Sequence, residues 1–173
     1  MTEDKLKQIK MVLLDVDGVL TSGDIIYSDS GEQIKIFNVR DGVGIRLLKE
    51  AGLKVGIITG RKGKALHHRC VNLGIDLIFD GVRRKDKVLD DITARTGIPK
   101  DAMAFMGDDL PDLPVMKRVG LAVAVGDAHE IIRRKAHIIT SAPGGKGAVR
   151  EISEAILKAQ GKWAELIGRL FDG

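Results

Sequence analysis

The chain has 173 residues, with 28 Lys and Arg against 24 Asp and Glu, so its formal charge is +4. This length favours one domain that can bury a sizeable core. The single cysteine excludes an internal disulfide and fits a reducing compartment. No apolar run approaches the ~20 residues that span a bilayer, and the first residues lack the apolar stretch of a secretory signal. We therefore expect a cytoplasmic protein with no membrane partner.

The mild positive charge raises the question of nucleic-acid binding. Only four Phe, one Trp and one Tyr are present, which is few for a surface that stacks on bases. The basic residues are interspersed with acidic ones rather than gathered in a stripe. A small acidic substrate or a solvated surface explains the charge equally well, and we expect no nucleic-acid partner.

Short apolar runs alternate with helical patterns along most of the chain. Near-continuous apolar runs of strand length indicate strands that are buried on both faces, as in a parallel sheet. The alternation predicts an α/β fold with a doubly wound, mainly parallel, Rossmann-like sheet and helices on both faces. Residues 148–159 and 163–171 indicate one or two closing helices. The predicted strands are at residues 11–14, 55–58, 77–79, 103–106, 121–125 and 138–139.

One segment breaks this alternation after the first predicted strand. Residues 24–27 and 33–37 are strand-like, and the residues between them include Gly31. This pattern predicts a β-hairpin with a glycine-containing turn. Because the hairpin is too short to be a domain, we expect residues 1–173 to form a single domain with an insertion at 24–37.

Polar residues directly follow three of the predicted strands. Asp15 and Asp17 follow the first strand, Thr59 follows the second, and Asp108 follows the fourth. Ligands of open parallel sheets bind beyond the carboxyl ends of the strands, so these side chains should share one edge. Asp17 and Gly18 also fit a simple turn. The functional interpretation is that Asp15 attacks phosphorus and Asp17 protonates the leaving oxygen and later activates water.

An anionic nucleophile needs positive charge beside it when it approaches a phosphate. Mg²⁺, held by oxygen ligands, would supply that charge. Asp108 is the best candidate ligand, because it lies nearest a strand end in the run Gly107-Asp108-Asp109-Leu110-Pro111-Asp112. Asp109 and Asp112 could be ligands or supporting partners, and a polar turn before a helix is the alternative for the whole run.

Several cations could complete such a site, and residue type alone does not select among them. Lys85 and Lys87 lie in a basic run after the third strand, where a solvated surface is the alternative. Thr59-Gly60-Arg61 offers a hydroxyl, flexible backbone and a planar cation for an anion. Arg40, just before a predicted helix, and Arg46, within its first turns, could bind an anionic substrate. Asp41 could simply be a helix cap.

Taken together, these motifs resemble the haloacid dehalogenase superfamily of phosphohydrolases over nearly the whole chain. The motifs occur in order at Asp15-Val16-Asp17-Gly18-Val19, Thr59, a lysine before the third helix, and Gly107-Asp108-Asp109. The resemblance implies Asp15 as nucleophile, Asp17 as acid and base, Thr59 as a phosphate contact, and a catalytic lysine. It also implies Mg²⁺ bound by Asp15, the Asp17 backbone carbonyl and Asp108.

The catalytic lysine of that superfamily lies four residues after a glycine. Gly81 therefore selects Lys85. The following Asp86 departs from the apolar residue usual at that position, so Lys87 stays an alternative.

Further motifs are similar to a capless branch of the superfamily, the phosphatases of 3-deoxy-D-manno-octulosonate 8-phosphate. They are residues 37–42, 57–62, 107–116 and 144–151. The resemblance implies a homotetramer in which the hairpin packs between subunits and active sites lie near the interfaces. Arg61 and Arg69 match substrate-contacting arginines of that branch. The expected substrate-binding residues are Asp17, Asn38, Arg40, Asp41, Gly42, Arg46, Gly60, Arg61, Arg69 and Lys85.

The function expected from this resemblance is hydrolysis of 3-deoxy-D-manno-octulosonate 8-phosphate for lipopolysaccharide synthesis. Phosphatases of nine-carbon, sialic-type sugar 9-phosphates are an alternative, although they tend to carry Glu where this chain has Arg61. A broad sugar phosphatase is a further alternative. An alternative from another functional class is a non-catalytic regulatory or assembly subunit with the same fold.

Overall fold

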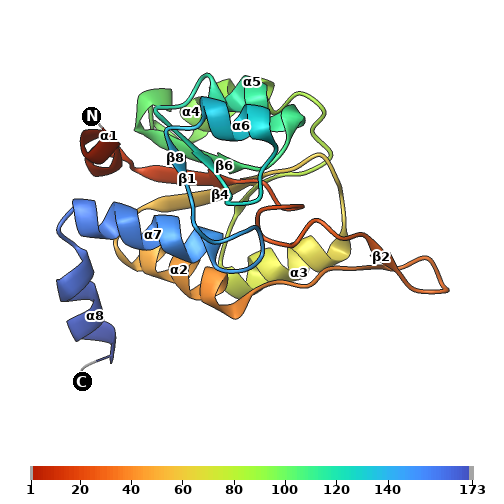
Figure 1. The fold of residues 1–173 in the computed structure, drawn as a ribbon. Coiled ribbons are helices and arrows are strands. Elements are labelled where there is room, and N and C mark those ends of the chain that lie inside the picture. Colours follow the sequence, from red (N-terminus) through yellow and green to blue (C-terminus); the bar gives the residue numbers. More distant parts are fainter. Residues whose placement is uncertain (1, 172–173) are drawn as a thin grey trace.

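A six-stranded sheet forms the centre of the computed structural model, which describes residues 2–171 (Figure 1). Its order is β5-β4-β1-β6-β7-β8, and every neighbouring pair is parallel. The predicted doubly wound α/β fold is confirmed. The strands are β1 (Met11–Leu14), β4 (Lys54–Ile58), β5 (Leu77–Phe79), β6 (Met103–Gly107), β7 (Leu121–Ala124) and β8 (Ile138–Ile139).

The central strands are buried on both faces, which is why their sequences are continuous apolar runs rather than alternating ones. Every residue of β1, β6 and β7 is buried. β1 lies between β4 and β6, and Leu14 pairs with Ile57 on one side and Met106 on the other. The carboxyl ends of the three neighbouring strands β4, β1 and β6 therefore lie side by side.

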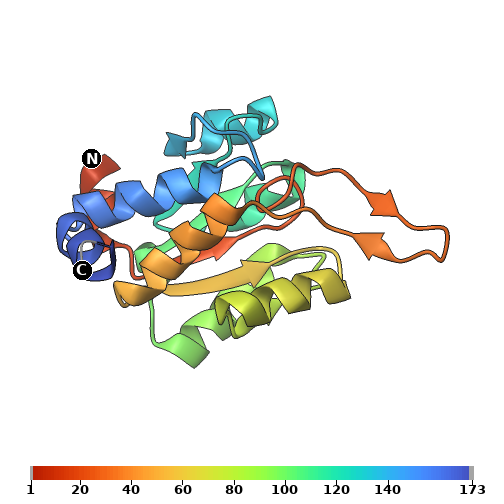
Figure 2. The same cartoon turned by 90° about the horizontal axis from the view of Figure 1, so that it is seen from below.

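Helices cover both faces of the sheet (Figures 1 and 2). One face carries α2 (Val39–Glu50), α3 (Lys64–Leu73) and α7 (Ala148–Ala159), and the other carries α4 (Val88–Thr96), α5 (Leu113–Met116) and α6 (Glu130–Lys135). Three 3₁₀ turns connect elements: η1 (Lys85–Lys87), η2 (Lys100–Ala102) and η3 (Leu110–Asp112). Across residues 2–171, none of the helices has the length and apolar character needed to cross a membrane.

Two terminal helices complete the chain. α8 (Trp163–Phe171) was predicted, whereas α1 (Thr2–Gln8) was not. α1 has seven residues and buries only Leu6, so it has too few apolar positions for a helical period to show in the sequence.

The hairpin projects away from the rest of the molecule (Figures 1 and 2). Its strands are β2 (Ile26–Tyr27) and β3 (Gln33–Ile34), which pair antiparallel with Ile26 opposite Ile34. They are shorter than the predicted 24–27 and 33–37. Large apolar side chains are exposed along it, namely Ile25, Ile26, Tyr27, Ile34 and Ile36.

Candidate active site

The carboxyl ends of β1, β4 and β6 meet at one cleft, as the sequence predicted. Asp15 follows β1, Thr59 follows β4 and Asp108 follows β6. The cleft has a volume of about 520 Å³. Its lining residues are Asp15, Asp17, Gly23, Ile25, Thr59, Gly60, Arg61, Val82, Arg83, Lys85, Asp108, Asp109, Pro111 and Asp112.

Asp15 is a buried carboxylate with one satisfied and one unsatisfied oxygen. Its side chain lies at the end of a fully buried strand, and its Oδ2 is 2.7 Å from Lys85 Nζ. Its Oδ1 has no hydrogen-bond partner among the described residues. The pKa of the Asp15 carboxyl is raised to about 6, first by burial and then by the Asp112 carboxylate, and the Lys85 ammonium opposes both. A buried, unpaired carboxylate oxygen of this kind calls for a cation or a proton.

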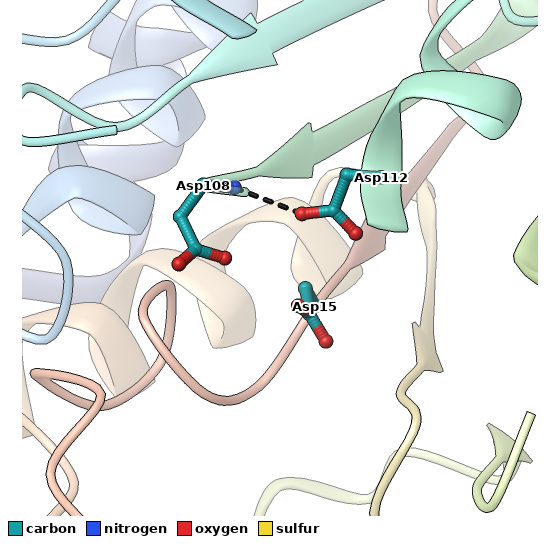
Figure 3. Close-up of side chains that lie close together, drawn as sticks. All are labelled: Asp15, Asp108 and Asp112. Carbon is teal, nitrogen blue, oxygen red and sulfur yellow. Dashed lines mark hydrogen bonds between the residues drawn. The ribbon is translucent and has the colours of Figure 1, made fainter. Parts of the chain in front are cut away.

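Asp108 faces Asp15 and Asp112 across the cleft, and the three carboxylates point toward one another (Figure 3). One oxygen from each lies within 4.8 Å of the others. The pKa of the Asp108 carboxyl is raised to about 8, first by burial and then by the nearby Asp15 and Asp112 carboxylates. The site therefore suits a hard cation with oxygen ligands.

Gly18 is required where the loop after β1 closes against Asp108. Its φ is +87°, in the region that favours glycine, and a Cβ built there would lie 2.0 Å from Asp108 Oδ2. Any side chain at this position would displace the carboxylate. The Asp-Gly pair after β1 thus has a packing reason beyond the turn itself.

Asp112 supports the site rather than facing the cation position. Its Oδ1 lies 2.6 Å from Lys85 Nζ. Its Oδ2 accepts a hydrogen bond from the backbone N–H of Asp108 (Figure 3) and another from the backbone N–H of Asp109. Both oxygens are therefore engaged. Asp109 is exposed, and its Oδ1 accepts from the Leu110 N–H to cap η3. The free carboxylate oxygens that remain belong to Asp15 and Asp108, two of the three predicted metal ligands.

The two candidate lysines occupy different environments. Lys85 is buried between Asp15 and Asp112, whereas Lys87 is exposed. Burial alone would lower the pKa of Lys85, but the two carboxylates outweigh burial and raise it. The unusual Asp86 between the two lysines binds Arg84 at 3.1 Å, and its backbone carbonyl accepts from Arg118.

Asp17 and the second strand end form the other wall of the cleft. Asp17 Oδ2 lies 3.9 Å from Arg61 Nε, and Asp17 Oδ1 accepts a hydrogen bond from Lys35. Thr59 is buried, and its hydroxyl accepts from the Arg61 N–H at 3.5 Å. The sequence analysis missed Lys35. A usable signal was present, because Lys35 alternates with Ile34 and Ile36 and so lies on the opposite face of the strand.

Three predicted substrate-binding residues, Asn38, Arg40 and Asp41, lie at the start of α2 and outside the cleft. Asn38 caps α2 by accepting from the Arg40 N–H, and its amide donates to the Gly145 carbonyl. Asp41 is 1% exposed and accepts from the N–H groups of Gly147 and Arg150, so it caps α7. Arg40 itself is exposed and lines a different hollow.

Three further predicted contacts, Gly42, Arg46 and Arg69, also lie outside the cleft of this chain, whereas Asp17, Gly60, Arg61 and Lys85 line it. Arg69 donates to the Asn38 carbonyl at 3.1 Å and lies over the Phe37 ring. A Cβ on Gly42 would lie 2.4 Å from the Arg69 guanidinium, so this glycine leaves room for it. Arg46 is exposed and donates to the Asn72 carbonyl. Substrate contact by these residues stays a prediction, one that requires a neighbouring subunit.

Comparison with known proteins agrees with this geometry. Residues 75–152 match the family model of haloacid dehalogenase-like hydrolases. The chain is 45% identical over 165 residues to the 3-deoxy-D-manno-octulosonate 8-phosphate phosphatase KdsC of Escherichia coli K12, covering 95% of this chain and 88% of that protein. The crystal structure of the Yersinia pestis phosphatase superposes with a TM-score of 0.93 at 43% identity, covering 94% of this chain and 88% of that one.

A second solved structure carries ligands. The 3-deoxy-D-manno-octulosonate 8-phosphate phosphatase of Moraxella catarrhalis, in complex with a magnesium ion, a phosphate ion and KDO, has a TM-score of 0.94 at 40% identity. The match covers 97% of each chain. The chain therefore belongs to the haloacid dehalogenase-like hydrolases and, among them, to the 3-deoxy-D-manno-octulosonate 8-phosphate phosphatase family.

Proposed function

We propose that this chain is a Mg²⁺-dependent phosphatase that hydrolyses 3-deoxy-D-manno-octulosonate 8-phosphate to the free sugar acid and phosphate, for lipopolysaccharide synthesis. The observation that carries the proposal is the unpartnered Oδ1 of buried Asp15, between Lys85 and Asp108. The similarity to KdsC phosphatases supports the choice of substrate.

Asp15 and Asp17 divide the reaction into two steps. An Asp15 oxygen attacks phosphorus, the bond between phosphorus and the sugar oxygen breaks, and Asp17 gives its proton to that oxygen. The sugar leaves and Asp15 holds an aspartyl-phosphate. Asp17 then takes a proton from water, whose oxygen attacks phosphorus, so that phosphate leaves and Asp15 is regenerated.

The other residues of the site bind the cation and the phosphate during both steps of the reaction. Asp15, the Asp17 backbone carbonyl and Asp108 would hold Mg²⁺, which shields the phosphate charge from the nucleophile when it is bound. Lys85 orients Asp15 through its 2.7 Å contact and balances the charge of the phosphate. Thr59 and Gly60 offer a hydroxyl and a backbone N–H for the transferring phosphoryl group.

The assembly expected for this function is a homotetramer of single-domain subunits, spanning residues 1–173 with the 24–37 insertion, in the cytoplasm. Two observations support it. The hairpin exposes large apolar side chains that a partner would cover. In addition, the expected contact residues Asn38, Arg40, Asp41, Gly42, Arg46 and Arg69 do not line the cleft of their own chain, and in the proposed assembly they would meet a substrate in a neighbouring subunit's cleft.

A substrate panel tests the proposal. We would measure kcat/KM for the eight-carbon acid phosphate, a nine-carbon sialic-type 9-phosphate and neutral sugar phosphates, with Mg²⁺ and with a chelator. We expect the eight-carbon compound to be preferred, the chelator to abolish release, and Asp15→Asn to cost at least about 1000-fold in kcat. Asp91→Asn, an exposed aspartate on α4, is the matched control.

Each alternative corresponds to a distinct result of that panel. A preference for the nine-carbon compound would replace the proposed substrate, and equal rates on all sugars would indicate a broad phosphatase. If no sugar phosphate released phosphate even at high enzyme concentration, a non-catalytic regulatory subunit would be favoured.

A further inference from the structure

Lys35 is buried on an element that otherwise exposes its apolar side chains. It follows β3 in the hairpin, and its side chain is 3% exposed. Its neighbours Ile34 and Ile36 are 49% and 68% exposed. This reverses the usual arrangement, in which lysine faces water and isoleucine is buried. The hairpin therefore uses its inner face to bring one ammonium to Asp17, a lining residue of the cleft.

The environment of this ammonium leaves hydrogen-bonding capacity unused. Among the described residues, Lys35 Nζ has one recorded partner, Asp17 Oδ1. An ammonium has three N–H donors, and leaving buried donors without partners costs free energy. Lys85, by contrast, contacts both Asp15 and Asp112. The contact with Asp17 alone does not account for burying Lys35.

The position of Lys35 indicates which group the remaining N–H donors of its ammonium could bind. Lys85 contacts the nucleophile Asp15, which faces phosphorus. Lys35 contacts Asp17, which in the proposed reaction faces the oxygen of the leaving sugar. Lys35 thus lies behind Asp17, next to the sugar side of the cleft but not among its lining residues. Arg61 approaches the other Asp17 oxygen at 3.9 Å, so both oxygens of Asp17 face cations in the free chain.

Asp17 must present an oxygen to the leaving group, and the Lys35 ammonium occupies one of its two oxygens. We propose that Lys35 is a specificity-determining residue whose ammonium turns from Asp17 to a negatively charged group of the leaving sugar. An acidic sugar then replaces Asp17 as the partner of the lysine, whereas a neutral sugar leaves the lysine on Asp17. The inference rests on the proposed function and specifies how that site selects an acidic sugar.

The test compares two substrates across variants of Lys35. We would measure kcat and KM for 3-deoxy-D-manno-octulosonate 8-phosphate, which carries a carboxylate, and mannose 6-phosphate, which does not. Lys35→Met should lower kcat/KM for the acidic substrate about 10- to 100-fold, mainly through KM, because one charge-assisted contact is lost. For mannose 6-phosphate the change in kcat/KM should be smaller, so that the ratio of the two kcat/KM values falls. Lys35→Arg keeps the charge and should keep most of the preference.

Controls separate this role from a structural one. Lys64→Met removes an exposed lysine at the start of α3 and should leave the preference intact. If Lys35→Met does not fold, Lys35→Gln supplies a second neutral side chain. An equal loss on both substrates, or an unchanged preference, would overturn the assignment of Lys35 alone. A wild-type enzyme with no preference for the acidic sugar would overturn the proposed function and this assignment together.

Discussion

At the scale of single residues, the charges around Asp15 are unbalanced. Three carboxylates, those of Asp15, Asp108 and Asp112, face the single ammonium of Lys85. The cluster therefore lacks two positive charges when all three acids are ionised, which is the charge of one Mg²⁺. Burial and mutual repulsion raise the pKa of Asp15 to about 6 and that of Asp108 to about 8. Without a cation, the cluster therefore binds protons instead.

A first prediction concerns the two neighbouring lysines. Lys85→Ala should lower kcat at least about 100-fold, because the nucleophile and the phosphate lose their nearest ammonium. Lys87→Ala removes an exposed lysine from the same turn and should stay within about twofold of wild type. The measurement is turnover of both variants with saturating Mg²⁺, beside thermal unfolding. Near-normal activity of Lys85→Ala would rule out its catalytic role.

Site residues that follow a strand could be predicted from the sequence better than residues whose role depends on tertiary contacts. Asp15, Thr59 and Asp108 follow buried apolar runs, so their convergence could be predicted from the order of the strands. Residue type alone could not choose between Lys85 and Lys87, because both lie in a basic run. The spacing from Gly81 favoured Lys85 through the family resemblance, and packing shows that Lys85 is buried. The role of Asp41 could not be predicted either. It accepts hydrogen bonds from backbone N–H groups of residues that lie more than a hundred positions later in the chain.

At the scale of elements, the parallel strands were predictable within one residue at each end. For β1, β6 and β7 the reason is burial on both faces, which leaves no polar position to interrupt the run. The hairpin strands were predicted too long. With only two strands and no core beneath them, few of their residues pair across the hairpin. The apolar pattern extended beyond the paired residues because those side chains are exposed rather than packed within this chain.

The exposed side of the hairpin leads to a prediction about assembly. Tyr27 is 61% exposed at the end of β2. In the proposed tetramer, Tyr27→Asp would place a charge in an apolar interface and should shift the protein to smaller species. Sedimentation velocity or light scattering at several protein concentrations would measure the shift.

The matched control is Ile131→Asp, which changes another exposed apolar side chain on α6, away from the hairpin. It should leave the mass unchanged. Identical masses for wild type and Tyr27→Asp at all concentrations would contradict a hairpin-mediated assembly.

At the scale of the whole molecule, the site is a junction of distant segments. β1, β4 and β6 each contribute one strand end, and the loop after β1 closes on Asp108 through Gly18. The backbone of Gly145 also donates to the Val19 carbonyl, which fixes the segment before α7 against the same loop. Because these segments meet only in the folded chain, the protonation of the acidic cluster is coupled to folding.

The sign of this coupling predicts how stability changes with pH. In the folded, metal-free chain the pKa values of Asp15 and Asp108 are raised to about 6 and about 8, above the ordinary value of about 4. Between pH ~4 and ~8 the folded chain thus holds more protons than the unfolded chain, so the free energy of unfolding falls as pH rises. Thermal unfolding in the presence of a chelator should show a lower Tm at pH 8.5 than at pH 5.5.

Magnesium should reverse this loss, because it binds the deprotonated carboxylates. At about 100 times its Kd it would stabilise the fold by about 2.7 kcal/mol, or roughly 5–10 °C in Tm, and the effect should be larger at pH 8.5 than at pH 5.5. Asp108→Asn removes a carboxylate from the cluster and should abolish most of both effects, whereas Asp91→Asn should preserve them. A magnesium shift that is equal at the two pH values, or that survives in Asp108→Asn, would contradict Asp108 as a ligand.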